Sequence, residues 1–127
     1  IIKNQFYGEL LVGQAAIVPI KESEYKYLIS APTMRVPMCV SGTVNAYLAF
    51  RAVCLSVLDH NIKNENQKIN SILCPGLGTG IGKMSSEICA KQMYEAYNSI
   101  INGNITEYSD LMYAYLADRR LIGLINA

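Results

Sequence analysis

The sequence predicts an α/β fold with three layers, in which a mixed sheet is covered by helices on both faces. Three observations lead to this prediction. Runs of β-forming residues and amphipathic runs follow one another in the order strand, strand, helix, strand, helix. The third β-forming run is short and mostly apolar, as in strands that are buried on both faces. With 127 residues, 51% of them hydrophobic, the chain has room for one domain with a core of useful size.

The first two strands are predicted over residues 14–18 and 25–31. Both stretches are rich in β-branched, aliphatic or aromatic residues. A proline follows each of them, Pro19 and Pro32, and proline has no N–H group to donate to a neighbouring strand. The sequence therefore predicts that both strands end at these prolines.

The third strand and two long helices follow. Helical spacing of apolar residues predicts helices over residues 44–60 and 86–97. Thr43 and Ser85 precede them, and such hydroxyl side chains favour the N-cap position because they accept a free main-chain N–H. The apolar run at residues 69–74 predicts the buried third strand between the helices.

Both ends of the sequence give weaker patterns. Residues 1–6 resemble the last turns of a helix that Gly8 ends, and the chain starts with Ile rather than Met. We therefore expect residues 1–127 to be the C-terminal portion of a single domain that is incomplete at its N-terminus. Near the other end, residues 108–116 predict a short helix, and residues 121–125 predict a strand or a docked tail.

A glycine-rich stretch, residues 75–82, lies between the predicted third strand and the last long helix. Glycine tolerates a positive φ and has no Cβ, so such a loop can turn several main-chain N–H groups toward one anion. The N-terminus of the following helix adds further unpaired N–H groups and a partial positive charge. The sequence predicts a diphosphate-binding loop, with a purely structural turn as the alternative. Its residues are Gly76, Leu77, Gly78, Thr79, Gly80, Ile81 and Gly82.

Composition argues against several other classes of site. The glycine loop lacks the Gly-Lys-Ser/Thr of a Walker A loop and the spacing of the dinucleotide fingerprint. A net charge of +1 argues against nucleic-acid binding. Four widely spaced cysteines and a single His predict no metal site and no cofactor, and no apolar run is long enough to cross a membrane. Thiols in apolar surroundings indicate a reducing compartment, hence a cytoplasmic protein.

No catalytic residue can be assigned from the sequence. His60 lies near the end of a helix without a recognisable Ser or Cys partner. Arg35 is a candidate partner for either a carboxylate or a phosphate. The loop itself offers main-chain donors, which stabilise negative charge but abstract no proton.

Several stretches together resemble the macro domains, which bind ADP-ribose. Residues 75–81, after an apolar run, resemble the second ligand loop of that family. Residues 8–14, Gly-Glu-Leu-Leu-Val-Gly-Gln, and residues 31–37, Ala-Pro-Thr-Met-Arg-Val-Pro, resemble a signature of bacterial or phage-type macro-domain-like proteins. The resemblance covers residues 8–97 in the order that the family has.

This resemblance implies that the glycine loop binds the diphosphate of ADP-ribose or a related nucleotide, and that the partner is ADP-ribose or an ADP-ribosylated protein. One alternative is an ADP-ribosyl or ADP-ribose-phosphate hydrolase whose catalytic residues lie upstream of residue 1. Another is an interaction domain that keeps the fold without the ligand. Gly82 and Lys83 stand where the family often has an aromatic residue that stacks on the distal ribose, so the fold carries over more safely than the activity.

Overall fold

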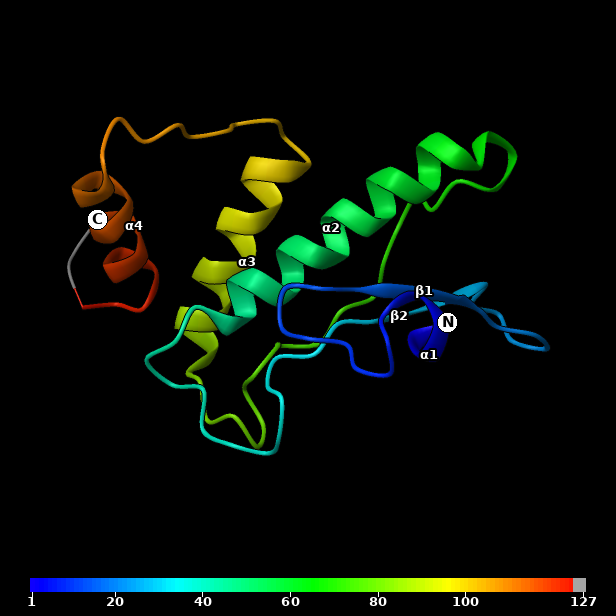
Figure 1. Cartoon of the computed structure of the whole chain (residues 1–127), viewed down its shortest axis with the longest axis horizontal. Coiled ribbons are helices and arrows are strands. Elements are labelled where there is room, and N and C mark those ends of the chain that lie inside the picture. The colour runs from blue at the N-terminus through cyan, green and yellow to red at the C-terminus, as the bar shows by residue number, and fades with distance from the viewer. Residues whose placement is uncertain (125–127) are drawn as a thin grey trace.

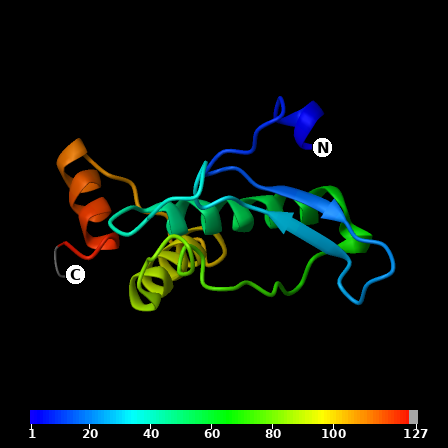
Figure 2. The same cartoon turned by 90° about the horizontal axis from the view of Figure 1, so that it is seen from below.

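The computed structural model describes residues 1–124, which form a β-hairpin, three helices of 11 to 19 residues and two short helical turns (Figure 1). The N-terminus lies near the hairpin and the C-terminal helix lies at the other end of the molecule (Figures 1 and 2). In chain order the elements are α1 (Ile2–Gln5), β1 (Ala16–Pro19), β2 (Tyr27–Ser30), α2 (Asn45–Lys63), η1 (Glu65–Gln67), α3 (Ser86–Ile100) and α4 (Leu111–Leu121).

The hairpin confirms the first two predicted strands, each within about two residues of its expected bounds. β1 and β2 are antiparallel, and their register pairs Ala16 with Ser30 and Pro19 with Tyr27. Pro19 is the last residue of β1, and its lack of an N–H suits this place at the end of the ladder. The inner face of β2 packs on α2, since Ile29 contacts the cluster that contains Phe50.

The core lies mainly between α2 and α3. Small residues let the two helices approach closely, and Ala46, Ala49 and Ala96 are fully buried. One buried cluster joins Phe50, Val53, Cys54 and Ala96 beneath the hairpin. A second cluster joins Val40, Ala46, Met84 and Cys89 and so anchors two long loops on the helices. This second cluster positions the candidate site.

The long helices are present where the sequence predicts them, but each runs further. α2 begins one residue later than predicted and continues to Lys63, and its N-cap is Val44 rather than the predicted Thr43. The Thr43 hydroxyl accepts the N–H of Asn45, the first residue of the helix, at 3.2 Å. α3 continues to Ile100, and Ser85 caps it as predicted by accepting the N–H of Ile88 at 3.2 Å.

The C-terminal helix α4 is displaced from its predicted position. The sequence predicts residues 108–116, whereas α4 begins after Asp110, whose carboxylate accepts the N–H groups of Met112 and Tyr113. The strand or tail predicted over residues 121–125 is instead the end of α4 and a turn at Gly123, and residue 125 lies outside the described part.

The third predicted strand is wrong for the described chain. Residues 69–74 form no strand, and Leu73 is 83% exposed. A strand needs a hydrogen-bonded neighbour, and β2 pairs only with β1 within residues 1–124. The main chain of Ile69 bonds instead to the side chain of Asn61 on α2, at 2.8 and 3.0 Å. The α/β class stands, but the observed sheet is a two-stranded antiparallel one rather than the centre of three layers.

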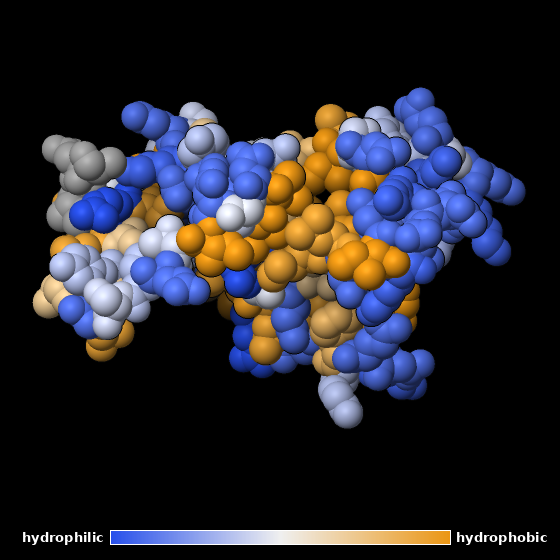
Figure 3. All heavy atoms as spheres, turned by 90° about the horizontal axis from the view of Figure 1, so that it is seen from above, coloured by the Kyte–Doolittle hydropathy of each residue, from blue (hydrophilic) through white to orange (hydrophobic). Residues whose placement is uncertain are grey.

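The molecule exposes much apolar surface. A wide apolar area occupies the middle of the face seen in Figure 3. α2 contributes exposed apolar side chains at helical spacing, namely Leu55, Leu58 and Ile62.

None of the helices within residues 1–124 is both long and apolar enough to cross a membrane.

Candidate functional site

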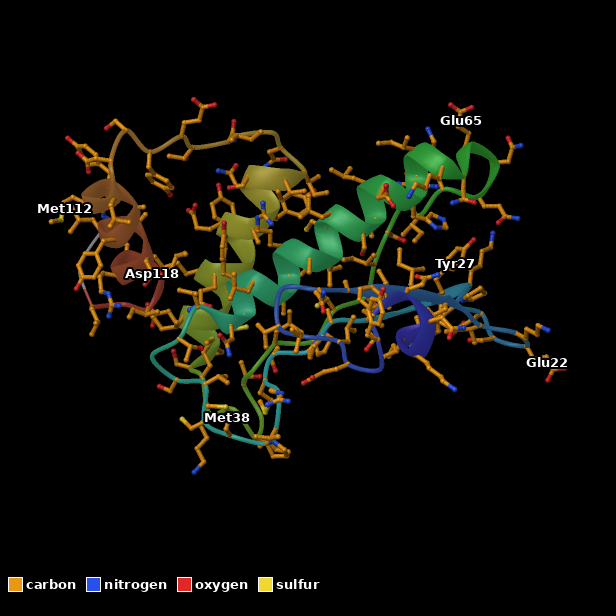
Figure 4. The ribbon with its side chains drawn as sticks, viewed as in Figure 1. Glu22, Tyr27, Met38, Glu65, Met112 and Asp118 are labelled. Atoms are coloured by element: carbon orange, nitrogen blue, oxygen red, sulfur yellow. The ribbon has the colours of Figure 1, made fainter. Side chains whose placement is uncertain are left out.

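Two loops form an open cavity of about 490 Å³ at the ends of β2 and of the segment before α3. The first loop, residues 31–37, follows β2, and the second is the glycine-rich loop, residues 75–82. They descend side by side below the helices in Figure 1, and Figure 4 shows Met38 projecting from the tip that the first loop leads into. The two stretches that resemble macro-domain motifs thus face each other across one cavity.

The glycine loop is held in place by main-chain contacts to the core. Val40 donates its N–H to the carbonyl of Gly82 at 2.8 Å, and its side chain is completely buried beneath the loop. Met84 donates to the carbonyl of Gly78 at 2.9 Å, which closes the loop on itself. The thiol of Cys89 on α3 donates to the carbonyl of Leu77 at 3.1 Å. The loop is therefore anchored before any ligand arrives.

Six of the seven predicted site residues line the cavity, and Thr79 does not. The Thr79 hydroxyl donates to the carbonyl of Gly76 at 2.7 Å, so it stabilises the turn instead of facing the cavity. The six are Gly76, Leu77, Gly78, Gly80, Ile81 and Gly82.

Main-chain donors remain available in this lining. Within residues 1–124, the N–H groups of Gly78, Gly80, Ile81 and Gly82 have no acceptor from the protein, whereas those of Thr79 and its neighbours Lys83 and Met84 bond within the loop. The cavity walls are otherwise largely apolar, with Pro and aliphatic residues on both loops. Unpaired N–H groups in such a setting are suited to an anion.

The helix N-terminus contributes less than the sequence predicts. Ser85 already satisfies the N–H of Ile88, and no residue of α3 lies in the cavity lining. Lys83 and Met84 separate the loop from the helix, and Lys83 itself adopts a positive φ of 58°. Binding of an anion therefore depends on the N–H groups of the loop itself. The N-terminus of α3 contributes no residue to the cavity lining.

The sequence does not predict that Glu9 pairs with Arg35, which lines the cavity. The Nε–H of Arg35 in the first loop donates to Glu9 Oε1 at 2.5 Å, and Nη2 lies 3.5 Å from Oε2. This hydrogen bond holds the pKa of Glu9 below its usual value, so the carboxylate is charged at neutral pH. Both residues lie in the two signature stretches, which is the only sequence signal that relates them.

Within residues 1–124, the buried thiols and His60 do not form a catalytic arrangement. Burial raises the pKa of the Cys54 thiol to about 11, and it also raises the pKa values of Cys74 and Cys89, so these thiols are protonated near neutral pH. His60 donates Nε2–H to the carbonyl of Gln67 at 2.9 Å and packs edge-on against Tyr27, at the other end of β2 from the cavity (Figure 4).

In the described part of the chain, no three His, Cys, Asp or Glu side chains lie together as a metal site would require.

Comparison with known proteins supports the resemblance seen in the motifs. An uncharacterized protein of Aquifex aeolicus (strain VF5) is 36% identical over 84 residues, which make up 66% of this chain and 47% of that protein. The chain thus spans about half the length of this relative. No solved structure matches significantly. The sequence profile of the Macro domain family matches residues 2–93, which include both loops of the cavity, and the chain therefore belongs to the macro domain family.

Proposed function

We propose that the cavity binds ADP-ribose or a related nucleotide, with the diphosphate held by the glycine loop. Macro domains generally bind ADP-ribose, and this chain is a member of that family. The observation that carries the proposal is the set of unpaired N–H groups at Gly78, Gly80, Ile81 and Gly82 in the cavity lining. Such donors suit phosphate oxygens, because each accepts several hydrogen bonds and carries negative charge.

The loop is prepared for this role by its anchoring. Val40, Met84 and Cys89 fix three of its carbonyl groups before binding, so little conformational entropy is lost when a ligand docks. The apolar side chains of the two loops, including Leu77 and Ile81, offer surface for the sugar and base.

The test is binding of ADP-ribose to the natural protein by calorimetry and by thermal unfolding. A ligand at 100 times its Kd stabilises the native state by about 2.7 kcal/mol, which raises Tm by several degrees. Adenosine, which lacks the phosphates, should bind much more weakly. Equal binding of both compounds contradicts the role of the loop, and no binding of either favours an interaction domain without ligand.

The proposed function is binding without catalysis by residues 1–127. Hydrolysis of an ADP-ribose ester needs a base or a water-orienting group within hydrogen-bond reach of the bond that breaks. The cavity lining described here contains no carboxylate, His or Cys. Incubation of a mono-ADP-ribosylated protein with the 1–127 chain should therefore release no ADP-ribose above the buffer rate. Release that is lost in a Gly80→Val variant would establish the hydrolase instead.

A further inference from the structure

Arg35 is the one charged side chain among the cavity-lining residues of the described chain. The other lining residues are glycines, prolines, aliphatic residues, one Met and one Thr. Arg35 extends from the first loop, and the glycine loop with its unpaired N–H groups forms the opposite wall. The guanidinium itself bonds to Glu9, which does not line the cavity, so it has to leave Glu9 to meet a phosphate that the glycine loop holds.

The guanidinium is held by a weak partner. Its contact with Glu9 lies at the surface, where the side chains of Arg35 and Glu9 are 74% and 47% exposed. Ion pairs in such exposure contribute little because water screens both charges. Within residues 1–124, Glu9 is the only carboxylate within ion-pair distance of Arg35. The guanidinium can therefore exchange one oxyanion for another at small cost.

We propose that Arg35 is the cationic phosphate-binding residue of this cavity and that Glu9 competes with the ligand for it. This inference rests on the proposed function of the site. A guanidinium presents several N–H donors in a planar fork, which matches two phosphate oxygens as well as it matches a carboxylate. A diphosphate carries at least two negative charges, so it displaces the single carboxylate of Glu9 more readily than an uncharged ligand does. The ligand class is thus a compound with a diphosphate.

Four variants of the natural protein test the proposal: Arg35→Ala, Arg35→Lys, Glu9→Gln and, as the control, Arg51→Ala. Arg51 is also an exposed arginine, but it lies on α2 outside the cavity lining. Calorimetry measures the Kd of three probes: ADP-ribose, inorganic pyrophosphate and adenosine. Thermal unfolding without ligand shows that each variant is folded.

Arg35→Ala should weaken ADP-ribose and pyrophosphate by about tenfold or more, since a charge-assisted pair is lost. The affinity of Arg35→Lys for both probes should lie between those of the parent and Arg35→Ala, because lysine keeps the charge but lacks the planar set of N–H donors. Glu9→Gln should tighten both probes severalfold, because the competing carboxylate is gone. Arg51→Ala should bind all probes as the parent does, and adenosine should not distinguish any of the proteins.

The outcomes separate this inference from the proposed function. Tight ADP-ribose binding that Arg35→Ala and Glu9→Gln leave unchanged overturns the role of Arg35 and keeps the function. If pyrophosphate binds in an Arg35-dependent way and ADP-ribose does not bind, the role of Arg35 stands and the proposal of a nucleotide ligand is overturned. Failure of the parent protein to bind either phosphate probe overturns both. Weaker binding in Glu9→Gln would show that Glu9 positions Arg35 rather than competing for it.

Discussion

The glycines of the loop differ in what they require. Gly78 has φ = 77°, and a Cβ there would meet Val40 Cγ2 at 3.0 Å. Gly80 has no positive φ, and a Cβ there would have no neighbour within 4 Å. Of these two glycines, only Gly78 therefore holds a conformation that is unfavourable for other residues. The sequence does not distinguish these two glycines, because the space beside Gly78 is limited by Val40, which is distant in the sequence.

This difference gives a matched pair of substitutions. Gly80→Val should leave the free energy of unfolding nearly unchanged and abolish nucleotide binding, because the new side chain projects from a cavity-lining position. Gly78→Val should destabilise the protein by about 1–3 kcal/mol, since a β-branched residue is strained at positive φ. Urea unfolding and calorimetry with ADP-ribose measure the two effects. Unchanged affinity in a folded Gly80→Val protein would show that the ligand does not lie at this loop.

The buried thiol of Cys54 predicts a loss of stability at alkaline pH. Burial raises its folded-state pKa from the ordinary 9.0 to about 11, so the folded protein keeps a proton that the unfolded chain releases. The resulting stabilisation is complete below pH 9 and is lost as pH rises toward 11. Urea unfolding between pH 7.5 and 10.5 should show a steeper decline for the parent than for Cys54→Ala. Parallel curves would mean that other groups cause the decline.

At the scale of the elements, the helices were the most predictable part of the fold. α2 and α3 are determined by their own apolar spacing, and Ser85 marks the start of α3 within the local sequence. α4 was placed too early because the N-cap role of Asp110 was overlooked. Residues 69–74 have the composition of a buried strand, but strand formation depends on a neighbour that local sequence does not reveal.

The candidate site was likewise predictable where it depends on local sequence and not where it depends on distant contacts. The glycine loop could be found from its sequence alone, as could its resemblance to a macro-domain motif. The role of Thr79 could not, because its hydroxyl satisfies a carbonyl three residues away instead of facing outward. Nor could the pairing of Glu9 with Arg35, since 26 residues separate them and only the folded chain brings them together.

Gln92 connects three helices and tests how the elements are held together. It is fully buried, its Oε1 accepts the N–H of Tyr47, and its Nε2 donates to the carbonyls of Thr43 and Leu121. Gln92→Leu keeps the volume but leaves these main-chain groups without a partner, so we expect a loss of about 2–4 kcal/mol in the free energy of unfolding. Urea unfolding measures this loss.

The control for this substitution is Glu95→Leu, on the exposed side of the same helix, which should change stability little. Gln92→Glu adds a second comparison, since a carboxylate keeps the acceptor but buries a charge. Its destabilisation should diminish toward acidic pH, where the protonated group can donate again. A Gln92→Leu protein as stable as the parent would show that water replaces the lost bonds.

At the scale of the whole molecule, the described chain leaves a groove of about 650 Å³ between β2 and residues 68–75. Leu28 on one side and Leu73 on the other are 59% and 83% exposed. The second edge of β2 has no strand beside it within residues 1–124. Both walls run toward the same cavity, because residues 31–37 continue one and residues 75–82 continue the other. β2 and residues 68–75 therefore run in the same direction, and α2 lies between them in the sequence.

We propose that an extended segment of the natural protein outside residues 1–127 occupies this groove as a strand. It would pair with the free edge of β2 and with residues 69–74, and so complete the mixed sheet of a single three-layer domain. Two facts support this. The walls of the groove are largely apolar, and the part of the Aquifex aeolicus relative that matches this chain makes up 47% of that relative's length. An unpaired edge with exposed apolar residues also invites association between copies when it is left open.

The 1–127 chain produced alone should therefore self-associate through the groove. In that chain, Leu28→Asp combined with Leu73→Asp should reduce association, because charges repel at the open edge. Ile105→Asp is the control, since Ile105 is 76% exposed but lies outside the groove. Sedimentation measures the association. In the natural protein the same double substitution should have the opposite effect and lower stability, because charges would be buried against the added strand. A monomeric 1–127 chain that melts cooperatively would contradict the proposal, since it would show that the groove needs no occupant.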